Sequence, residues 1–140
     1  ANISTIWSLR QTQQHFLPAA WKDSKNILVE NWVNQPAVLA HPSVKVFISH
    51  CGMNSVQESI IEEVPVVCIP YFGDQHLVGF HLQDTGAGTM IMKEAGVFPA
   101  LLYSIQDVLR SNGTYQAQVS RVKKLLLQPG GLKKVTEIGM

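Results

Sequence analysis

The amino-acid sequence predicts an α/β fold in which a parallel sheet is flanked by helices. Short apolar runs alternate with stretches of helical periodicity, the order that is typical of βαβ units. Residues 66–69 form an apolar run between two prolines, as expected for a strand covered on both faces. Of the 140 residues, 46% are hydrophobic and 15% are charged. This composition favours one globular domain or a large piece of one.

The apolar runs place the predicted strands. We expect strands at residues 4–9, 27–32, 44–49, 66–69 and 88–92. The third is the clearest, and a helix follows the turn at residues 50–53. Four apolar residues of this helix fall on one face at 3.6 residues per turn: Val56, Ile60, Ile61 and Val64. Pro65 is expected to end the helix.

Three further helices follow in the sequence. One begins after the loop at residues 70–75 and is expected to stop at Gly86, because glycine readily adopts the left-handed conformation that ends helices. The next opens at Pro99 and stops at residues 112–113. The last long helix runs from about residue 115 to 128, and a short amphipathic piece follows the break at residues 129–131.

Charge and hydropathy argue against nucleic-acid binding and against a membrane-spanning segment. The formal net charge is +1, and Lys and Arg are absent from residues 46–92, so nucleic-acid binding is not expected. The basic residues that gather near the C-terminus are interpreted as a solvated helix face; they are Arg121, Lys123, Lys124, Lys133 and Lys134. No stretch reaches 18 consecutive apolar residues, so the chain contains no membrane segment. It begins at Ala1 directly before a strand, which suggests a fragment of a longer protein.

The chain contains two cysteines, Cys51 and Cys68, each inside an apolar run. Their number and spacing indicate neither a disulfide framework nor a zinc site. The redox compartment stays undetermined.

Polar residues concentrate in three turns that follow predicted strands. Ligands of open parallel sheets bind beyond the carboxyl ends of the strands, so these turns form the candidate site. In the turn at residues 50–55, a glycine allows close approach to the backbone, and the positive end of the following helix attracts an anion. His50, Asn54 and Ser55 add hydrogen-bond donors, and this combination fits a diphosphate.

The other two turns offer different chemistry, and each turn has a structural alternative. Trp32 is an aromatic ring that can stack on a nucleobase, or it is a core residue. Asp74 and Gln75 offer a carboxylate and an amide to hydroxyl groups, or they only build a loop. Ser55 and Glu58 also match a capping box, in which they satisfy the helix N–H groups. His50 alone is compatible with an ordinary hydrogen-bonded loop histidine.

The joint spacing of these residues resembles a known signature. Trp-x-x-Gln, His-Cys-Gly-x-Asn-Ser-x-x-Glu and Pro-x-x-x-Asp-Gln span the 44 residues from Trp32 to Gln75. This pattern resembles the donor-binding signature of UDP-dependent glycosyltransferases, at the length of the plant version. The resemblance implies the GT-B fold, which has two Rossmann-like domains. Residues 1–140 then correspond to most of the C-terminal, UDP-sugar-binding domain, without its first strand and without the N-terminal acceptor domain.

The resemblance also implies a role for each part of the signature. The implied donor-binding residues are Trp32, Val33, Gln35, His50, Gly52, Asn54, Ser55, Glu58, Asp74 and Gln75. By position, Trp32 stacks on uracil, Gln35 lies beside the base and ribose, and Glu58 accepts hydrogen bonds from the ribose hydroxyls. The segment from His50 to Ser55 holds the diphosphate. Asp74 and Gln75 bind hydroxyls of the transferred sugar.

The activity that the resemblance implies is an inverting, metal-independent transfer of a hexosyl group, glucose, from a UDP-sugar to a hydroxyl of a small lipophilic acceptor. The resemblance implies that UDP-sugar is a co-substrate and that no cofactor or metal is needed, and the lack of an Asp-x-Asp pair in the sequence agrees with metal independence. The family's general base lies in the absent N-terminal domain, so no catalytic residue is assigned in this chain. This fragment alone is expected to be inactive. A non-catalytic sugar-nucleotide-binding module is the alternative function.

Some positions depart from the family pattern. Glu63 stands where a glycine usually precedes Val-Pro, so we expect a different cap at that helix end. The run Phe72-Gly73-Asp74-Gln75, with Gly79, resembles sterol glucosyltransferases, so the acceptor stays open. Relatives are cytosolic or anchored in the endoplasmic reticulum, and the sequence does not decide between these locations.

Overall fold

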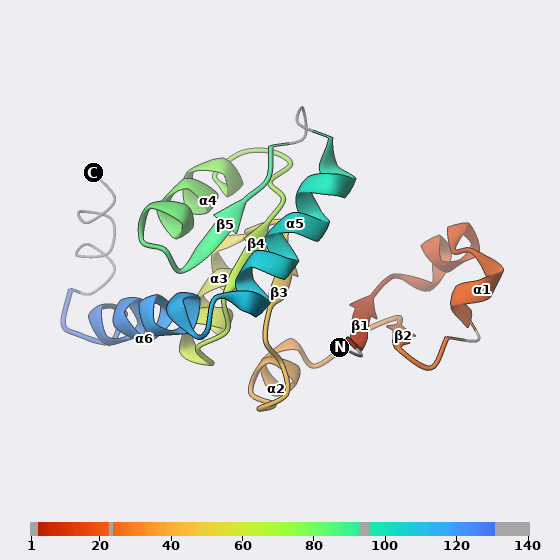
Figure 1. Cartoon of the computed structure of the whole chain (residues 1–140), viewed down its shortest axis with the longest axis horizontal. Helices are drawn as coiled ribbons and strands as arrows, with labels where there is room; N and C mark the ends of the chain where they lie inside the picture. Colours follow the sequence, from red (N-terminus) through yellow and green to blue (C-terminus); the bar gives the residue numbers. More distant parts are fainter. Residues whose placement is uncertain (1–2, 23, 93–95, 131–140) are drawn as a thin grey trace. The chain divides into compact units, whose positions relative to one another are not determined.

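The chain divides into two compact units, Ala1–Val38 (unit 1) and Leu39–Met140 (unit 2) (Figure 1). The computed structural model describes residues 3–22, 24–92 and 96–130. The last short amphipathic piece that the sequence predicts lies outside the described residues.

Unit 1 contains a parallel pair of strands, β1 (Thr5–Ser8) and β2 (Ile27–Glu30), with Thr5 opposite Ile27. The connection between them holds a 3-10 helix, η1 (Gln11–Phe16), and one helical turn, α1 (Ala19–Lys22). The rings of Trp7 and Trp21 pack with centroids 5.9 Å apart, which joins α1 to β1. A further short helix, α2 (Gln35–Leu39), begins in unit 1 and ends at the first residue of unit 2.

Unit 2 is a three-layer arrangement around a parallel sheet with the strand order β3-β4-β5 (Figure 1). Its strands are β3 (Phe47–Ser49), β4 (Val66–Cys68) and β5 (Gly88–Met90). Its longer helices are α3 (Met53–Ile61), α4 (Gln75–Asp84), α5 (Val97–Arg110) and α6 (Thr114–Leu126).

β4 forms the centre of the core, because all three of its residues are completely buried. Val66 and Cys68 point to one face, where they pack with apolar side chains of α3, α4 and α6. Val67 points to the opposite face and packs with Val108 of α5. This alternation is what a strand covered on both sides requires.

Two residues of α4, Gly79 and Gln83, contact the sheet at β5. Gly79 brings α4 close to the sheet, since a Cβ there would lie 2.6 Å from Met90 Sδ and 2.9 Å from Cys68 Sγ. Gln83 of α4 accepts a hydrogen bond from the Met90 N–H through its Oε1 at 3.2 Å. That N–H points away from β4, because the neighbouring Ile91 N–H is the one that bonds to Cys68 O.

The α/β architecture and all five predicted strands are confirmed, although each strand is shorter than its predicted run. The four longer helices are also confirmed. The short helices η1, α1 and α2 were not predicted, because they are too short to show a helical period.

In unit 2, the parallel strand order β3-β4-β5 is that of three consecutive strands in one half of a Rossmann sheet. Among the described residues, no strand pairs with both β1 and β3. That the chain opens at the second strand of a donor-binding domain stays a prediction.

The expectation of a different cap at the end of α3 is wrong. Glu63 has a φ of +59°, the Val64 N–H bonds to Ser59 O at 2.9 Å, and the Glu63 N–H bonds to Ile60 O at 3.1 Å. These bonds are those of the Schellman motif that glycine usually forms. A glutamate therefore adopts the left-handed conformation, and its carboxylate pairs with Lys123 of α6 at 3.0 Å.

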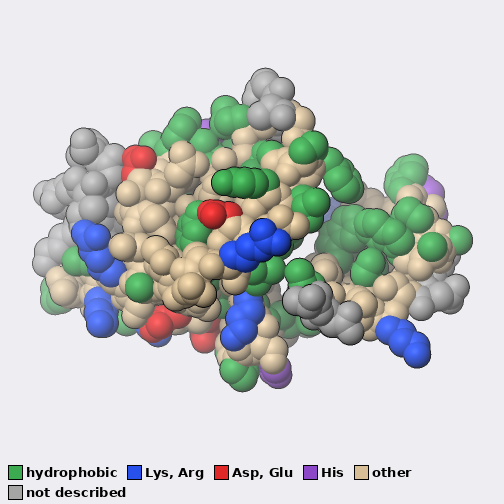
Figure 2. Space-filling model, viewed as in Figure 1, with side chains coloured by type: hydrophobic (Ala, Val, Ile, Leu, Met, Phe, Trp, Pro, Cys, Tyr) green, Lys and Arg blue, Asp and Glu red, His purple; other side chains and the backbone are tan. Residues whose placement is uncertain are grey.

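On the face drawn in Figure 2, the Lys and Arg side chains of the described residues stand in separate small groups.

The ion pair between Glu63 and Lys123 predicts a pH-dependent contribution to stability. The hydrogen bond from Lys123 holds the pKa of Glu63 below its ordinary value of 4.5. A carboxyl whose pKa is lowered by folding stabilises the fold above its unfolded pKa, and the stabilisation is lost as the pH falls through the lowered value. Because the Glu63 side chain is 43% exposed, Lys123→Gln should cost only about 0.2–1 kcal/mol at about pH 7.

Urea unfolding of the chain and of Lys123→Gln, at about pH 7 and about pH 3, measures this contribution. The difference in unfolding free energy should be smaller at the lower pH, because part of the Glu63 population is then protonated. A cost of equal size at both values would mean that Lys123 contributes through packing and not through its charge.

Candidate functional site

The turn between β3 and α3 brings the first group of predicted site residues together. Gly52 is the N-cap of α3, with an extended φ of −61° and ψ of 138°, and as a glycine it has no side chain with which to cap the helix. The helix begins at Met53, so Ser55 lies inside its first turn. The capping-box interpretation of Ser55 and Glu58 is therefore wrong, because the cap stands three residues earlier. Asn54 and Ser55 lie within the positive end of the helix.

The His50 imidazole lies directly against Gly52. A Cβ at position 52 would lie only 2.7 Å from His50 Nε2 and 3.3 Å from its Cε1. Any side chain larger than hydrogen would therefore displace the ring. Gly52 allows the exposed imidazole to stand at the N-terminus of α3, where an anion is favoured.

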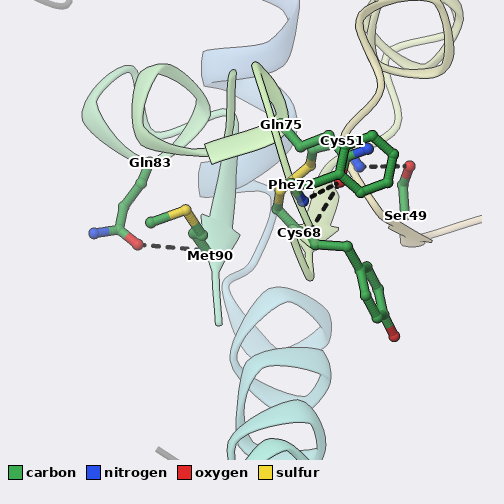
Figure 3. The surroundings of a disulfide bond; sticks show 8 residues. Ser49, Cys51, Cys68, Phe72, Gln75, Gln83 and Met90 are labelled. Atoms are coloured by element: carbon green, nitrogen blue, oxygen red, sulfur yellow. Dashed lines mark hydrogen bonds between the residues drawn. A yellow bond between two sulfur atoms is a disulfide. The ribbon is translucent and has the colours of Figure 1, made fainter. Parts of the chain in front are cut away.

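Cys51 fixes the middle of this turn from the buried side. It is completely buried, has a φ of +65°, and donates its N–H to Ser49 Oγ at 3.1 Å (Figure 3). Its sulfur is joined to that of Cys68, with the two Cα atoms 5.5 Å apart. The expectation that the two cysteines indicate no disulfide is thus wrong. The sequence did not indicate this link, because Cys51 follows β3 and Cys68 ends β4, and only the structure shows that these two strands are neighbours.

Glu58 lies further along α3, and its position relative to Asn54 and Ser55 follows from helix geometry. Residues three or four apart share a face of a helix, so Glu58 stands on the same side as these two residues. It is half-buried.

The loop after β4 carries the second group, Asp74 and Gln75. Gln75 is 5% exposed, and its Oε1 accepts hydrogen bonds from the Tyr71 N–H at 2.9 Å and the Phe72 N–H at 3.2 Å (Figure 3). Two N–H groups require an acceptor, so the amide NH2 is the part of Gln75 that faces elsewhere. Asp74 is the exposed N-cap of α4 and makes no capping hydrogen bond with its side chain.

Both groups lie at one edge of the sheet. β3 and β4 are parallel neighbours with Ser49 opposite Cys68, so the turn at residues 50–52 and the loop at residues 70–74 follow the same strand ends. The structure therefore brings seven predicted residues to one edge of unit 2: His50, Gly52, Asn54, Ser55, Glu58, Asp74 and Gln75.

The remaining three residues, Trp32, Val33 and Gln35, follow β2 in unit 1. Trp32 is 73% exposed, so the alternative of a core tryptophan is wrong. Val33 is half-buried, and Gln35 is the first residue of α2. Since these residues belong to a different unit, their joint binding with the other seven stays a prediction.

The described residues contain neither a group of side chains for a metal ion nor a helix that could cross a membrane. Residues 3–22, 24–92 and 96–130 contain no group of three or more His, Cys, Asp or Glu side chains that could hold a metal ion. Within the same ranges, every helix is too short or too polar to cross a membrane.

Comparisons with known proteins identify the family. Residues 2–126 match the family described as UDP-glucoronosyl and UDP-glucosyl transferase. Anthocyanidin 3-O-glucosyltransferase 2 from Fragaria ananassa is 40% identical over 136 residues, which cover 91% of this chain and 28% of that protein. The chain belongs to this glycosyltransferase family. A putative UDP-glucuronosyltransferase from Caenorhabditis elegans is 38% identical over 102 residues, covering 73% of the chain and 19% of that protein.

Solved structures agree with the family. Os79 from O. sativa in complex with UDP superposes with a TM-score of 0.78 at 26% identity, covering 97% of this chain and 33% of that one. The predicted α/β fold of a GT-B glycosyltransferase is confirmed. This glycosyltransferase chain spans only 19–33% of the length of the three relatives named.

The contact between His50 and Gly52 predicts the effect of a methyl group. In Gly52→Ala, the new Cβ should push the imidazole away from the helix N-terminus, while the backbone, whose φ suits alanine, keeps its conformation. Nuclear Overhauser contacts between the His50 ring and the α-protons of residue 52 should be lost. The unfolding free energy should change by less than about 1 kcal/mol. Unchanged ring contacts in the variant would contradict the packing described here.

Proposed function

We propose that the chain is the UDP-sugar-binding part of a glycosyltransferase that transfers glucose from UDP-glucose to a hydroxyl of a small lipophilic acceptor. The observation that carries the proposal is the N-terminus of α3. It stands at the end of β3, begins at a glycine and has the His50 imidazole beside it. A helix N-terminus in this position is a favourable site for a diphosphate.

The charge of the surrounding segment supports a diphosphate held without Lys or Arg. Residues 46–92 contain neither, so the anion would be held by backbone N–H groups, by His50 and by the polar side chains of Asn54 and Ser55. Charge that builds up on the departing UDP would meet the same preorganised groups. Electrostatic stabilisation of this kind lowers the barrier of a displacement reaction.

The two ends of the donor would be recognised by different groups. Trp32 is an exposed ring that can stack on uracil, with Val33 and Gln35 beside it. Glu58 would accept hydrogen bonds from the ribose hydroxyls. Asp74 would accept hydrogen bonds from hydroxyls of the sugar, and Gln75 would donate to them through its NH2 group, because its oxygen is engaged with the loop.

Glucose is proposed over a glucuronosyl group on grounds of charge. A glucuronosyl group carries a carboxylate, which the Asp74 side chain would repel. The segments that follow β3 and β4 contain no Lys or Arg side chain to neutralise that charge. A neutral hexose avoids this cost.

The transfer proposed is a direct displacement with inversion. The acceptor oxygen attacks the anomeric carbon, the bond to the phosphate oxygen of UDP breaks, and a base outside this chain takes the acceptor proton. None of the five histidines in the sequence is assigned that role. No metal is part of the proposal, and the UDP complex of the Os79 relative supports UDP as the group recognised.

The direct test is calorimetric titration of the chain with UDP. His50→Ala should weaken UDP binding by about 1.5–3 kcal/mol, the range for a hydrogen bond to a charged group. His41→Ala is the matched control, because His41 is an exposed histidine before β3 that only accepts a hydrogen bond from the Ser43 N–H. An equal loss in both variants, or no loss in either, would remove the assignment of His50.

Gln75→Glu separates the two functions of the Gln75 amide. The carboxylate still accepts the Tyr71 and Phe72 N–H groups, so the loop should stay in place, but the NH2 donor is lost. UDP affinity should fall in this variant, because the new carboxylate repels the diphosphate, and the additional affinity for UDP-glucose over UDP should fall by a further amount of about 0.5–1.5 kcal/mol. Titrations with both nucleotides measure these values. An unchanged difference between UDP-glucose and UDP would contradict the sugar contact of Gln75.

A further inference from the structure

Ser49 is a buried polar residue beneath the turn that carries His50. It is the last residue of β3 and is 8% exposed. Its Oγ accepts the Cys51 N–H at 3.1 Å, and its backbone oxygen accepts the Ile69 N–H of the neighbouring strand segment at 2.8 Å. Figure 3 shows the Ser49 side chain directed at the Cys51 backbone. Ser49 therefore connects the sheet to the turn at residues 50–52.

The residue that Ser49 holds is in an unfavourable backbone conformation. Cys51 has a φ of +65°, a region that residues with a Cβ avoid. Such a conformation persists only where surrounding contacts enforce it. Two contacts do so here: the hydrogen bond from the Cys51 N–H to Ser49 and the link between Cys51 and Cys68.

The conformation of Cys51 determines where its two neighbours stand. Cys51 lies between His50 and Gly52, and the imidazole of the first packs on the backbone of the second. If Cys51 relaxed to an extended conformation, the chain direction between these residues would change and the imidazole would leave the N-terminus of α3. The cross-link to Cys68 fixes the side chain of Cys51, whereas the Ser49 bond fixes its peptide N–H.

We propose that Ser49 is a positioning residue of the diphosphate site, which acts through Cys51 on His50 and Gly52 and does not itself contact the nucleotide. This inference rests on the proposed function. It assigns a role to a residue that lies within the 44-residue signature but is not one of its specified positions. A serine that only satisfied a buried N–H group would contribute to stability but not to nucleotide affinity.

Ser49→Ala, compared with a matched serine variant, tests the proposal in the full chain. The control is Ser59→Ala, since Ser59 is also buried and bonded to the backbone, through Oγ to Val64 O at 2.7 Å, at the opposite end of α3. Both variants should lower the midpoint of thermal unfolding. Only Ser49→Ala should weaken UDP binding, by about three- to tenfold.

Two further measurements follow the mechanism itself. Hydrogen exchange of the Cys51 amide should become faster in Ser49→Ala and stay unchanged in Ser59→Ala. Ser49→Thr keeps the hydroxyl and should restore both the slow exchange and the UDP affinity. If the additional methyl group prevents folding of this variant, the contrast between the two alanine variants decides alone.

The outcomes separate this inference from the proposed function. If the unmodified chain does not bind UDP, the proposed function fails and the role of Ser49 fails with it. If the chain binds UDP and His50→Ala weakens binding, but Ser49→Ala does not, only the role of Ser49 is wrong. Equal losses of affinity in the Ser49 and Ser59 variants would likewise reduce Ser49 to a contribution to stability.

Discussion

Complete burial of β4 is the constraint on which the arrangement of unit 2 depends. Val66, Val67 and Cys68 are inaccessible to solvent, so apolar helices must cover the strand on both faces. α3, α4 and α6 supply one cover and α5 supplies the other. Because β4 also pairs in parallel with a strand on each side, the segments that leave β3 and β4 emerge at the same edge of the sheet. The polar turns stand together for this reason.

The parts of the fold that sequence could predict are those determined by local patterns. The apolar run at residues 66–69 identified β4, and the glycine at position 86 marked the end of α4 within about two residues. The start of α3 after the turn was predicted within one residue, but the alternative of a capping box at Ser55 and Glu58 was wrong, because the cap is Gly52, whose conformation depends on the turn before it. The end of α3 was misjudged because the left-handed position holds Glu63, which an ion pair from another helix accompanies.

The candidate site shows the same division between local and distant information. The spacing of the signature was sufficient to identify the family and to name residues that gather at one edge of unit 2. The cross-link between Cys51 and Cys68 depends on which strands are neighbours, and neighbouring strands cannot be read from residue types alone. The role of Ser49 depends on the φ of Cys51, for which the sequence contains no signal. Trp32 could be assigned to the site by its place in the signature, but its exposure required the structure.

The hydrogen bond from the Met90 N–H to Gln83 has a consequence for the behaviour of the chain in solution. β5 is the outer strand of its sheet, and exposed N–H groups on an outer strand are templates on which strands of other molecules can assemble. The Gln83 side chain already accepts the hydrogen bond of one of these N–H groups, that of Met90, where α4 contacts β5. A helix thus shields the margin of the sheet against intermolecular strand addition, the first step toward aggregation.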